Sequence, residues 1–357
     1  MDVSILQTIS NNFINELLTA SNGEKTSFTF TKNTIPSASL VKNGEIFQAM
    51  AVGGSIFVNA MVKNEVPSLK ILHFQREDQP QFSTKEIFLD FIASQYNSSA
   101  STIALNFAYD VNPVFEEGKL QAILNVPSKE NAFTGLIGEN LCKEIEEYIL
   151  KTKHHKIQVS GANDTICLLL SGLTQTFSNN LAAGIVGTGV NFALFLDTNT
   201  PVNLEAGGFD KFPRSKEGIT IDASSNRKGE HLFEKEISGA YLHRYFNILL
   251  EEKNITYPII KTTEEVSQIA ENDTSEIGNV ARDILERSAQ LTACAISGIT
   301  KFKKHNMTFV MQGSLFWKGY HYKQIVEKTV KELLPEFTVE FIEVENSDIL
   351  GAAKLVA

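Results

Sequence analysis

The chain has 357 residues and a formal net charge of −10 at pH 7, with 43% hydrophobic and 21% charged residues. This profile is typical of a globular protein long enough to form two lobes, and the acidic balance argues against a nucleic-acid-binding surface. No apolar run approaches the ~20 residues that a membrane-spanning helix needs, so we expect no membrane span.

The cysteines and the first residues indicate where the protein works. Cys142, Cys167 and Cys294 are far apart in the sequence and match no zinc-site spacing. We therefore expect buried, reduced thiols in a cytoplasmic protein. Apolar residues recur at helical spacing over residues 5–18, without a basic segment before them or a cleavage site after them, which predicts an amphipathic helix and not a signal peptide.

The first half of the chain alternates strands and helices. In chain order we expect strands over residues 45–74 with turns at 53–54 and near 67, a helix over 85–96, a strand over 101–111, a helix over 138–153 and a strand over 156–161. The first turn, Gly53-Gly54-Ser55, lies between two apolar stretches and is of the kind that can receive a phosphate on its backbone N–H groups.

The pattern restarts in the second half with another hairpin, over residues 182–197, whose turn is Gly187-Thr188-Gly189. It continues with helices over 230–252 and 275–302, a strand over 307–313, a helix over 321–334, a strand over 337–344 and a short helix at the C-terminus. Two successive units of this kind predict an α/β protein of two related lobes, with a ligand site in the cleft between them.

One candidate for chemistry is Asn163-Asp164-Thr165, which follows a strand and begins an apolar, helix-like run. Its simplest interpretation is helix capping by Asn163 or Asp164. The same tripeptide recurs at residues 272–274, where it precedes a charged helix and is expected to act only as a cap.

Further candidates are glycine turns and isolated acids. The glycines around Thr188 would let the backbone approach phosphate oxygens, although no Gly-Lys-Ser/Thr follows as in a P-loop. Glu205 precedes a pair of glycines, and Glu234 lies on a predicted helix beside an apolar stripe, where a solvated helix-face glutamate is the alternative. Gly313-Ser314 precedes aromatic residues that would either seat an adenine or simply pack a loop.

The order of these features resembles the hexokinase family. "HLFEKEISGAYL" is similar to that family's F-E-K-x-I-S-G-x-Y-L, "VNLEAGGF" to N-x-E-W-G-x-F and "IVGTGVN" to I-V-G-T-G-x-N. Further similarity is found in "IPSASLV", "VPSKENAFTGLIG", "ERSAQLTACAISGI" and "GSLFWK". The resemblance extends from about Ile35 to Ala353, which is nearly the whole chain.

The resemblance implies a two-lobed actin-like ATPase fold of the ribonuclease H-like class, with sugar and ATP bound in the interlobe cleft. The small lobe would comprise residues 44–162, joined by the C-terminal helix 347–357, and the large lobe residues 1–43 and 163–346. The implied activity is Mg²⁺- and ATP-dependent phosphorylation of the 6-hydroxyl of glucose or a related hexose.

The family's functional residues can be assigned by similarity. Asp164 would be the general base for the sugar hydroxyl. The sugar contacts would be Ser128, Lys129, Asn163, Asn191, Glu205 and Glu234. The nucleotide contacts would be Gly53, Gly54, Ser55, Gly187, Thr188, Gly189, Gly313 and Ser314. The resemblance gives no protein residue as a direct ligand of the metal.

The first phosphate motif departs from the family's D-x-G-G-T-N-x-R. Here the acid position is Ala51 and the arginine position is Val58, while the turn glycines and a hydroxyl remain. In the family this acid helps to position Mg²⁺. Its loss would cost on the order of 10²–10³ in rate. A hexose-binding sensor or regulator with little turnover is therefore the alternative to an enzyme.

Overall fold

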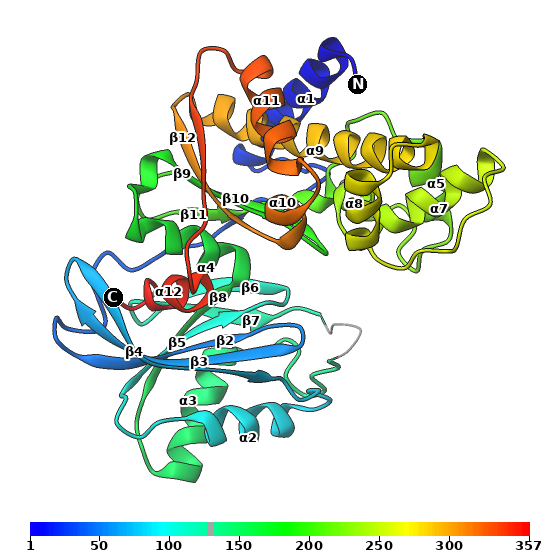
Figure 1. Cartoon of the computed structure of the whole chain (residues 1–357). Coiled ribbons are helices and arrows are strands. Elements are labelled where there is room, and N and C mark those ends of the chain that lie inside the picture. The colour runs from blue at the N-terminus through cyan, green and yellow to red at the C-terminus, as the bar shows by residue number, and fades with distance from the viewer. Residues whose placement is uncertain (127–130) are drawn as a thin grey trace. The chain divides into compact units, whose positions relative to one another are not determined.

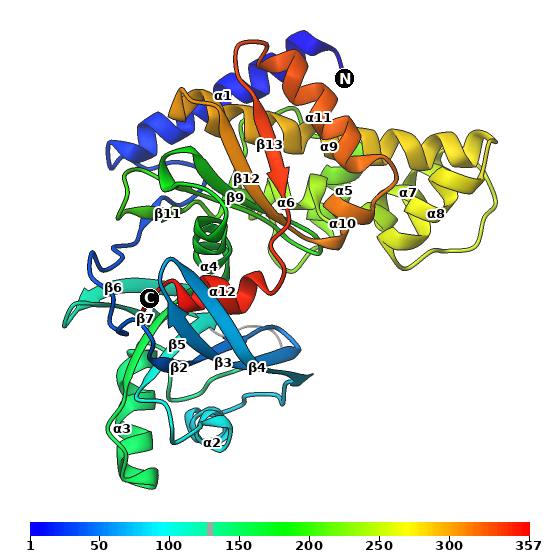
Figure 2. The same cartoon turned by 60° about the vertical axis from the view of Figure 1, so that its left-hand side comes forward.

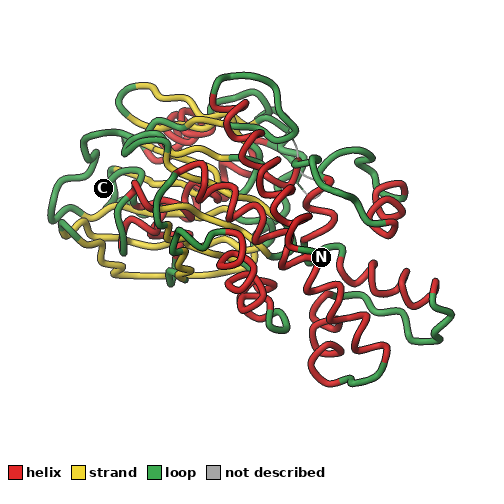
Figure 3. The backbone as a smooth tube through the Cα atoms, turned by 90° about the horizontal axis from the view of Figure 1, so that it is seen from above, coloured by secondary structure: helices red, strands yellow, loops and turns green. Residues whose placement is uncertain are grey.

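The structure is a computed structural model that describes residues 1–126 and 131–357. The chain divides into two compact units, and both helices and strands contribute to the structure (Figure 3). Unit 1 comprises residues 1–30, 184–192 and 204–343, and unit 2 comprises residues 31–183, 193–203 and 344–357. The lobe boundaries that the resemblance implies stay a prediction. Predicted sugar residue Ser128 and its neighbour Lys129 lie outside the described residues.

Unit 2 is built on a five-stranded sheet in the order β4-β3-β2-β5-β8. These strands are β2 (Ile46–Val52), β3 (Ile56–Glu65), β4 (Ser68–Asp78), β5 (Thr102–Phe107) and β8 (Gln158–Asn163). The unit also contains a hairpin of β6 (Val111–Glu116) and β7 (Lys119–Leu124), the short strands β1 (Thr31–Lys32) and β11 (Pro201–Asn203), and the helices α2 (Lys85–Gln95), α3 (Leu141–Lys153), α4 (Asp164–Ser171) and α12 (Ser347–Ala353).

The burial of the strands in unit 2 follows from the topology of the sheet. β2 is antiparallel to β3 but parallel to β5, which is in turn parallel to β8. Every residue of β5 is buried, as expected for a parallel strand that is covered on both faces. Helices α2 and α3 lie on one side of this sheet, whereas α12 lies on the other (Figure 1).

Small residues allow α12 to pack closely against α4 and the sheet. A Cβ atom at Gly351 would lie 1.8 Å from the carbonyl oxygen of Cys167 on α4, so no larger residue fits there without a shift of the backbone. Ala49 and Ala104, which are fully buried, are partners in neighbouring strands β2 and β5. The last residues of the chain therefore complete the core of a unit that begins at residue 31.

Unit 1 is mainly helical. Its helices are α1 (Val3–Ser21), α5 (Lys216–Ala223), α6 (Leu232–Ile237), α7 (Leu242–Glu252), α8 (Thr263–Asn272), α9 (Glu276–Lys303), α10 (Ser314–Lys318) and α11 (Tyr322–Leu333). Its strands include the parallel pair β12 (Met307–Gln312) and β13 (Val339–Ile342). Helices α1 and α11 both pack on the long helix α9 (Figure 2).

The second glycine hairpin is formed by β9 (Leu181–Val186) and β10 (Val190–Phe195), which run through both units. These two strands are central in a six-stranded sheet of order β1-β11-β10-β9-β12-β13. The expected restart of the chain with a second glycine-turned hairpin is therefore confirmed.

Three details differ from the sequence-based expectations. The single helix expected over 230–252 is two helices, α6 and α7, because the backbone at Ser238 is extended and the next amide, of Gly239, donates to the carbonyl of Gly187 (2.7 Å). The β6–β7 hairpin was not expected. The cap of α9 is Ser275, whose hydroxyl accepts from the amide of Ile277, so the second Asn-Asp-Thr is not the cap.

A simpler expectation is confirmed. All three cysteines are free and buried. Among the described residues, no helix combines the length and the apolar character that are required to cross a bilayer.

Candidate functional site

Asp164 lies where strand β8 passes directly into helix α4. The side-chain oxygen of Asn163 accepts a hydrogen bond from the amide of Thr165 (2.9 Å), and Asn163 is therefore the cap of α4. The Asp164 carboxylate accepts from the hydroxyl of Thr165 (3.1 Å). Of the two capping alternatives, Asn163 performs this role, and the Asp164 carboxylate stands beside it at the first helical position.

The environment of Asp164 changes its acidity. Burial disfavours the charged carboxylate and raises its pKa, whereas hydrogen bonds from Thr165 and Asn163 oppose that effect, and the pKa is raised overall. A half-buried carboxylate with a raised pKa at the carboxyl end of a parallel strand is a frequent feature of active sites in α/β proteins.

In unit 1, Glu234 is directed toward the turn of the second hairpin. Its Oε2 atom accepts a hydrogen bond from the amide of Val190 (3.2 Å) and would lie 3.1 Å from a Cβ atom at Gly189. Burial raises the pKa of Glu234. Glu234 is thus half-buried against a glycine turn, and the alternative of a solvated helix-face glutamate is wrong.

The two residues after Glu234 have structural partners. Lys235 Nζ donates to Asp222 Oδ1 (2.6 Å), and Glu236 Oε2 accepts from Arg287 Nη2 (2.9 Å). Sequence reasoning did not single out either residue, although a buried Lys-Glu pair inside an apolar helix is a signal for such bridges. Both ion pairs hold α6 in place, which leaves Glu234 as the residue of the three that faces the glycine turn.

Asn191 and Glu205 lie next to this turn and bind each other. Asn191 Nδ2 donates to Glu205 Oε1 (3.1 Å), and Asn191 Oδ1 accepts from the amide of Ala206 (3.2 Å). Glu205 has a left-handed backbone with φ of 46°, which is strained for a residue with a side chain. The structure therefore brings Asn191, Glu205 and Glu234 together within unit 1, whereas Asn163 and Asp164 belong to unit 2.

Glycines bring three loops of unit 1 into contact around the Gly187-Thr188-Gly189 turn. A Cβ atom at Gly313 would lie 2.2 Å from the carbonyl oxygen of Val186, and one at Gly239 would lie 3.0 Å from that of Gly187. Gly313 also has φ of 118°, which side chains rarely allow. The predicted phosphate turn and the predicted adenosine residues Gly313 and Ser314 are therefore neighbours, with Thr188 and Ser314 exposed.

The first aromatic residue after Gly313 belongs to the core. Phe316 is fully buried and packs edge-to-face on Trp317, with ring centroids 5.0 Å apart. Trp317 Nε1 donates to the carbonyl of Met311 (3.1 Å). Of the two interpretations, packing holds for Phe316, and this segment is the short helix α10 and not a loop.

The first hairpin is closed by hydrogen bonds around Gly53. The Gly53 amide donates to the carbonyl of Ile56 (3.0 Å), and the Gly53 carbonyl accepts from the hydroxyl of Tyr109 (2.7 Å). A Cβ atom at Gly53 would lie 2.7 Å from the Ile56 oxygen, which explains the glycine. Gly54 and Ser55 are the exposed part of the turn.

A hydrated metal ion fits this arrangement better than a metal held in a protein cage. Among the described residues, no group of three His, Cys, Asp or Glu side chains is placed to hold a metal. Mg²⁺ commonly keeps several waters and binds through one or two carboxylates and substrate phosphates, which suits isolated acids such as Asp164.

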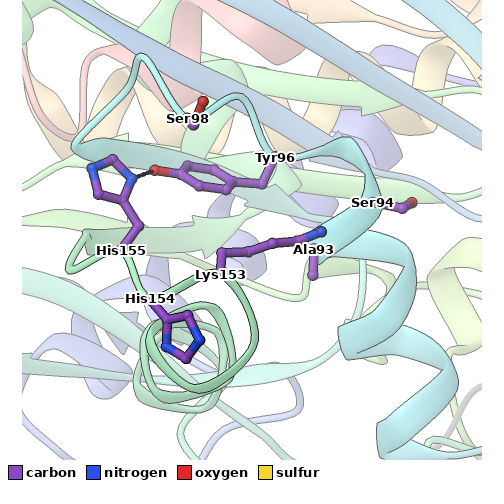
Figure 4. A pocket seen from close by; sticks show the side chains of 7 residues that line it. All are labelled: Ala93, Ser94, Tyr96, Ser98, Lys153, His154 and His155. Atoms are coloured by element: carbon purple, nitrogen blue, oxygen red, sulfur yellow. Dashed lines mark hydrogen bonds between the residues drawn. The ribbon is translucent and has the colours of Figure 1, made fainter.

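One pocket of unit 2 is lined by none of these residues. It lies at the ends of α2 and α3, where Tyr96 and His155 share a hydrogen bond through the tyrosine hydroxyl and Nδ1 (Figure 4). Its lining residues are Ala93, Ser94, Tyr96, Ser98, Lys153, His154 and His155. None of them was predicted to bind sugar or nucleotide.

Comparisons with known proteins identify the family. The sequence profile described as "Hexokinase" matches residues 181–253 and 249–357. Hexokinase-4 of Arabidopsis thaliana is 24% identical, over 87% of this chain and 79% of the relative. The solved hexokinase of Schistosoma mansoni, described as complexed with glucose, superposes with a TM-score of 0.80 at 18% identity and covers 100% of this chain and 95% of that one.

A more distant structure agrees in fold. A ROK hexokinase from Thermus thermophilus superposes with a TM-score of 0.63 at 13% identity, over 87% of this chain and 97% of that one. The expected two-lobed actin-like ATPase fold is thereby confirmed. The profile match, the relatives and the shared fold agree with the motifs read from the sequence, and the chain belongs to the hexokinase family of sugar kinases.

Proposed function

We propose that the protein is an ATP-dependent hexokinase that phosphorylates the 6-hydroxyl of glucose or a related hexose, with Asp164 as general base. The observation that carries this proposal is the different roles of two neighbouring side chains at the start of α4. Asn163 caps the helix, so the neighbouring Asp164 carboxylate is not needed for capping. A carboxylate held in this way, next to the end of a buried strand, is suited to accept the proton of a substrate hydroxyl.

The raised pKa of Asp164 is consistent with that role. A carboxylate becomes a stronger base as its pKa rises, provided that it is ionised at the working pH. Phosphoryl transfer has a loose transition state, so alignment of the hydroxyl counts for more than basicity. The hydroxyl of Thr165 donates to one oxygen of Asp164 and so helps to fix the orientation of the carboxylate toward the sugar hydroxyl.

Asn191, Glu205 and Glu234 would bind the other sugar hydroxyls, together with Asn163 and, by resemblance, Ser128 and Lys129. Carboxylates and amides accept and donate in pairs, which matches the paired hydroxyls of a hexose. A site of this kind rejects analogues that lack a hydroxyl, because its own half-buried polar groups would lose their partners. The glucose complex of the Schistosoma mansoni hexokinase supports glucose as the first sugar to test.

The nucleotide would be held by backbone groups and hydroxyls of the two glycine turns. Thr188 and Ser55, which are exposed, would contact phosphate oxygens, and Gly313 and Ser314 would line the adenosine site. Bound Mg²⁺ would neutralise charge on the phosphates during transfer. The free, buried cysteines support a cytoplasmic place for this carbohydrate phosphorylation.

A coupled assay for glucose 6-phosphate with Mg-ATP tests the proposal. We expect turnover by the unmodified protein and a loss of about 10²–10⁴-fold in Asp164→Asn, which keeps the size of the side chain but removes the base. Glucose should still raise the Tm of the variant, because the other sugar contacts remain. Unchanged turnover in Asp164→Asn would disprove the assigned role.

A second candidate is a hexose-binding protein with little or no turnover. The observation that favours it is Ala51, which is 6% exposed and brings no charge to the first hairpin. In that case glucose would raise the Tm, ADP with Mg²⁺ would not, and the coupled assay would show no phosphate transfer.

A further inference from the structure

A row of paired residues crosses the sheet of unit 2 at the level of Ala51. The register pairs Arg76 with Val58, Val58 with Ala51, and Ala51 with Asn106. Residues paired across neighbouring strands project from the same face of a sheet. The side chains of Arg76, Val58, Ala51 and Asn106 are therefore on one face, side by side.

This face is the one that α12 covers. Asn106, which is 5% exposed, donates from Nδ2 to the backbone carbonyl of Asp348 in the first turn of α12 (3.2 Å). The residues on either side of Ala51 in β2, Met50 and Val52, belong instead to the core cluster that α2 and α3 cover. The row thus faces the beginning of α12, where Asp348 stands.

Two charged side chains, those of Arg76 and Asp348, are near this row, although neither belongs to the β2–β3 hairpin. Burial raises the pKa of Asp348, and the guanidinium of Arg76 opposes that rise, so the two groups lie within electrostatic reach. Burial raises the pKa of the Cys167 thiol, and the carboxylates of Asp164 and Asp348 add to the rise. Asp348 is therefore near both Arg76 and the α4 region that holds Asp164.

We propose that Asp348 and Arg76 supply the acidic and basic charges that Ala51 and Val58 lack, with Asp348 facing the water shell of a divalent cation and Arg76 facing a phosphate group of the nucleotide. The inference rests on the proposed function. It assigns a carboxylate from α12 and a guanidinium from β4 to the place next to the first hairpin. Because both side chains lie in unit 2, the assignment does not depend on the placement of unit 1.

Binding of ADP with Mn²⁺, followed by electron paramagnetic resonance of the free Mn²⁺, tests the role of Asp348. We expect Asp348→Asn to weaken Mn-ADP binding at least tenfold, while binding of metal-free ADP changes less than twofold. Glu77→Gln is the matched control, since it removes one negative charge from β4 at a position next to Arg76 that projects from the opposite face. Equal Mn-ADP binding by Asp348→Asn and the unmodified protein would overturn the proposal.

The role of Arg76 is tested with the same ligand and with inorganic pyrophosphate. Arg76→Gln should weaken both about tenfold, as expected for loss of a charge-assisted phosphate contact. Lys70→Gln, which removes a positive charge elsewhere on β4, should change neither. If the unmodified protein binds no Mn-ADP, the ATP-dependent function itself fails; if it binds and the Asp348 and Arg76 variants bind equally well, only the present proposal fails.

A charge-coupling experiment checks the geometry without any ligand. Ala51→Asp would place a second carboxylate on the face of Asp348, whereas Ala51→Asn adds a similar volume without the charge. We expect Ala51→Asp to have a lower Tm than Ala51→Asn at pH 7, because the new carboxylate is buried and is repelled by Asp348, and this difference to become smaller when Asp348 is also changed to Asn. The same difference in both backgrounds would show that Asp348 does not face the row.

Discussion

At the scale of single residues, the burial of Asp164 couples activity to stability. Its pKa is raised in the folded protein because burial disfavours the carboxylate, so the unfolded chain ionises first as pH rises. The contribution of Asp164 to the free energy of unfolding is most favourable below the ordinary aspartate pKa of ~3.9, where the carboxyl is protonated. It is lost as the pH rises through the pKa of Asp164 in the folded protein. At neutral pH the ionised Asp164 therefore destabilises the fold.

This coupling predicts opposite effects of one substitution. Asp164→Asn should raise the Tm at pH 7 while it abolishes most turnover, and its advantage in Tm should shrink as the pH falls toward ~3.9. Calorimetry at several pH values measures the effect. The activity of the unmodified protein should fall on the acidic side through a pKa above the ordinary aspartate range. A lower Tm of Asp164→Asn at pH 7 would contradict this account.

At the scale of elements, the contact between α12 and α4 depends on one glycine. Alanine favours an α-helix over glycine by ~1 kcal/mol, so propensity alone would make Gly351→Ala stabilising. However, the added Cβ would lie 1.8 Å from the Cys167 carbonyl oxygen, which is backbone and cannot move aside as a flexible side chain does. Overpacking of this kind costs ~1–3 kcal/mol, so the clash outweighs the propensity.

We therefore expect Gly351→Ala to lower the free energy of unfolding by about 1–2 kcal/mol, measured by urea denaturation. Gly54→Ala is the matched control for stability, because a Cβ atom there would have no neighbour within 4 Å. Equal unfolding midpoints for the two variants would show that α12 does not pack as closely as described.

At the scale of the whole molecule, the buried thiols report on opening of each unit. Burial raises the pKa of Cys142 in unit 2 and of Cys294 in unit 1 to about 12. Thiolates are the reactive form, so native protein should react with a disulfide reagent at pH 8 only as fast as it opens, and all three thiols should react at once in urea. Rapid labelling of any cysteine without a change in circular dichroism would contradict the burial.

The sequence predicted more of the local structure than of the site. Both glycine hairpins were predicted correctly, because turn glycines and alternating apolar residues are local signals. The "FEKEISG" motif identified Glu234 as a candidate. The break after Ile237 was missed, since it depends on the hydrogen bond from Gly239 to Gly187, which the sequence does not reveal. The link from Ala51 through its strand partner Asn106 to the carbonyl of Asp348 could not be predicted either, because it depends on strand register and on a helix almost 300 residues away.

The position of α12 also dictates the order in which the protein can be completed during synthesis. The carbonyl of Val356 accepts hydrogen bonds from the amides of Leu40 and Val41, so the two segments of unit 2 that lie farthest apart in the sequence close on each other. As the chain leaves the ribosome, the alanine-lined face of strands β2 and β5 stays uncovered after residue 107 has emerged, until α12 follows from residue 347 onward. Assembly of unit 2 therefore ends only after all of unit 1 has been translated.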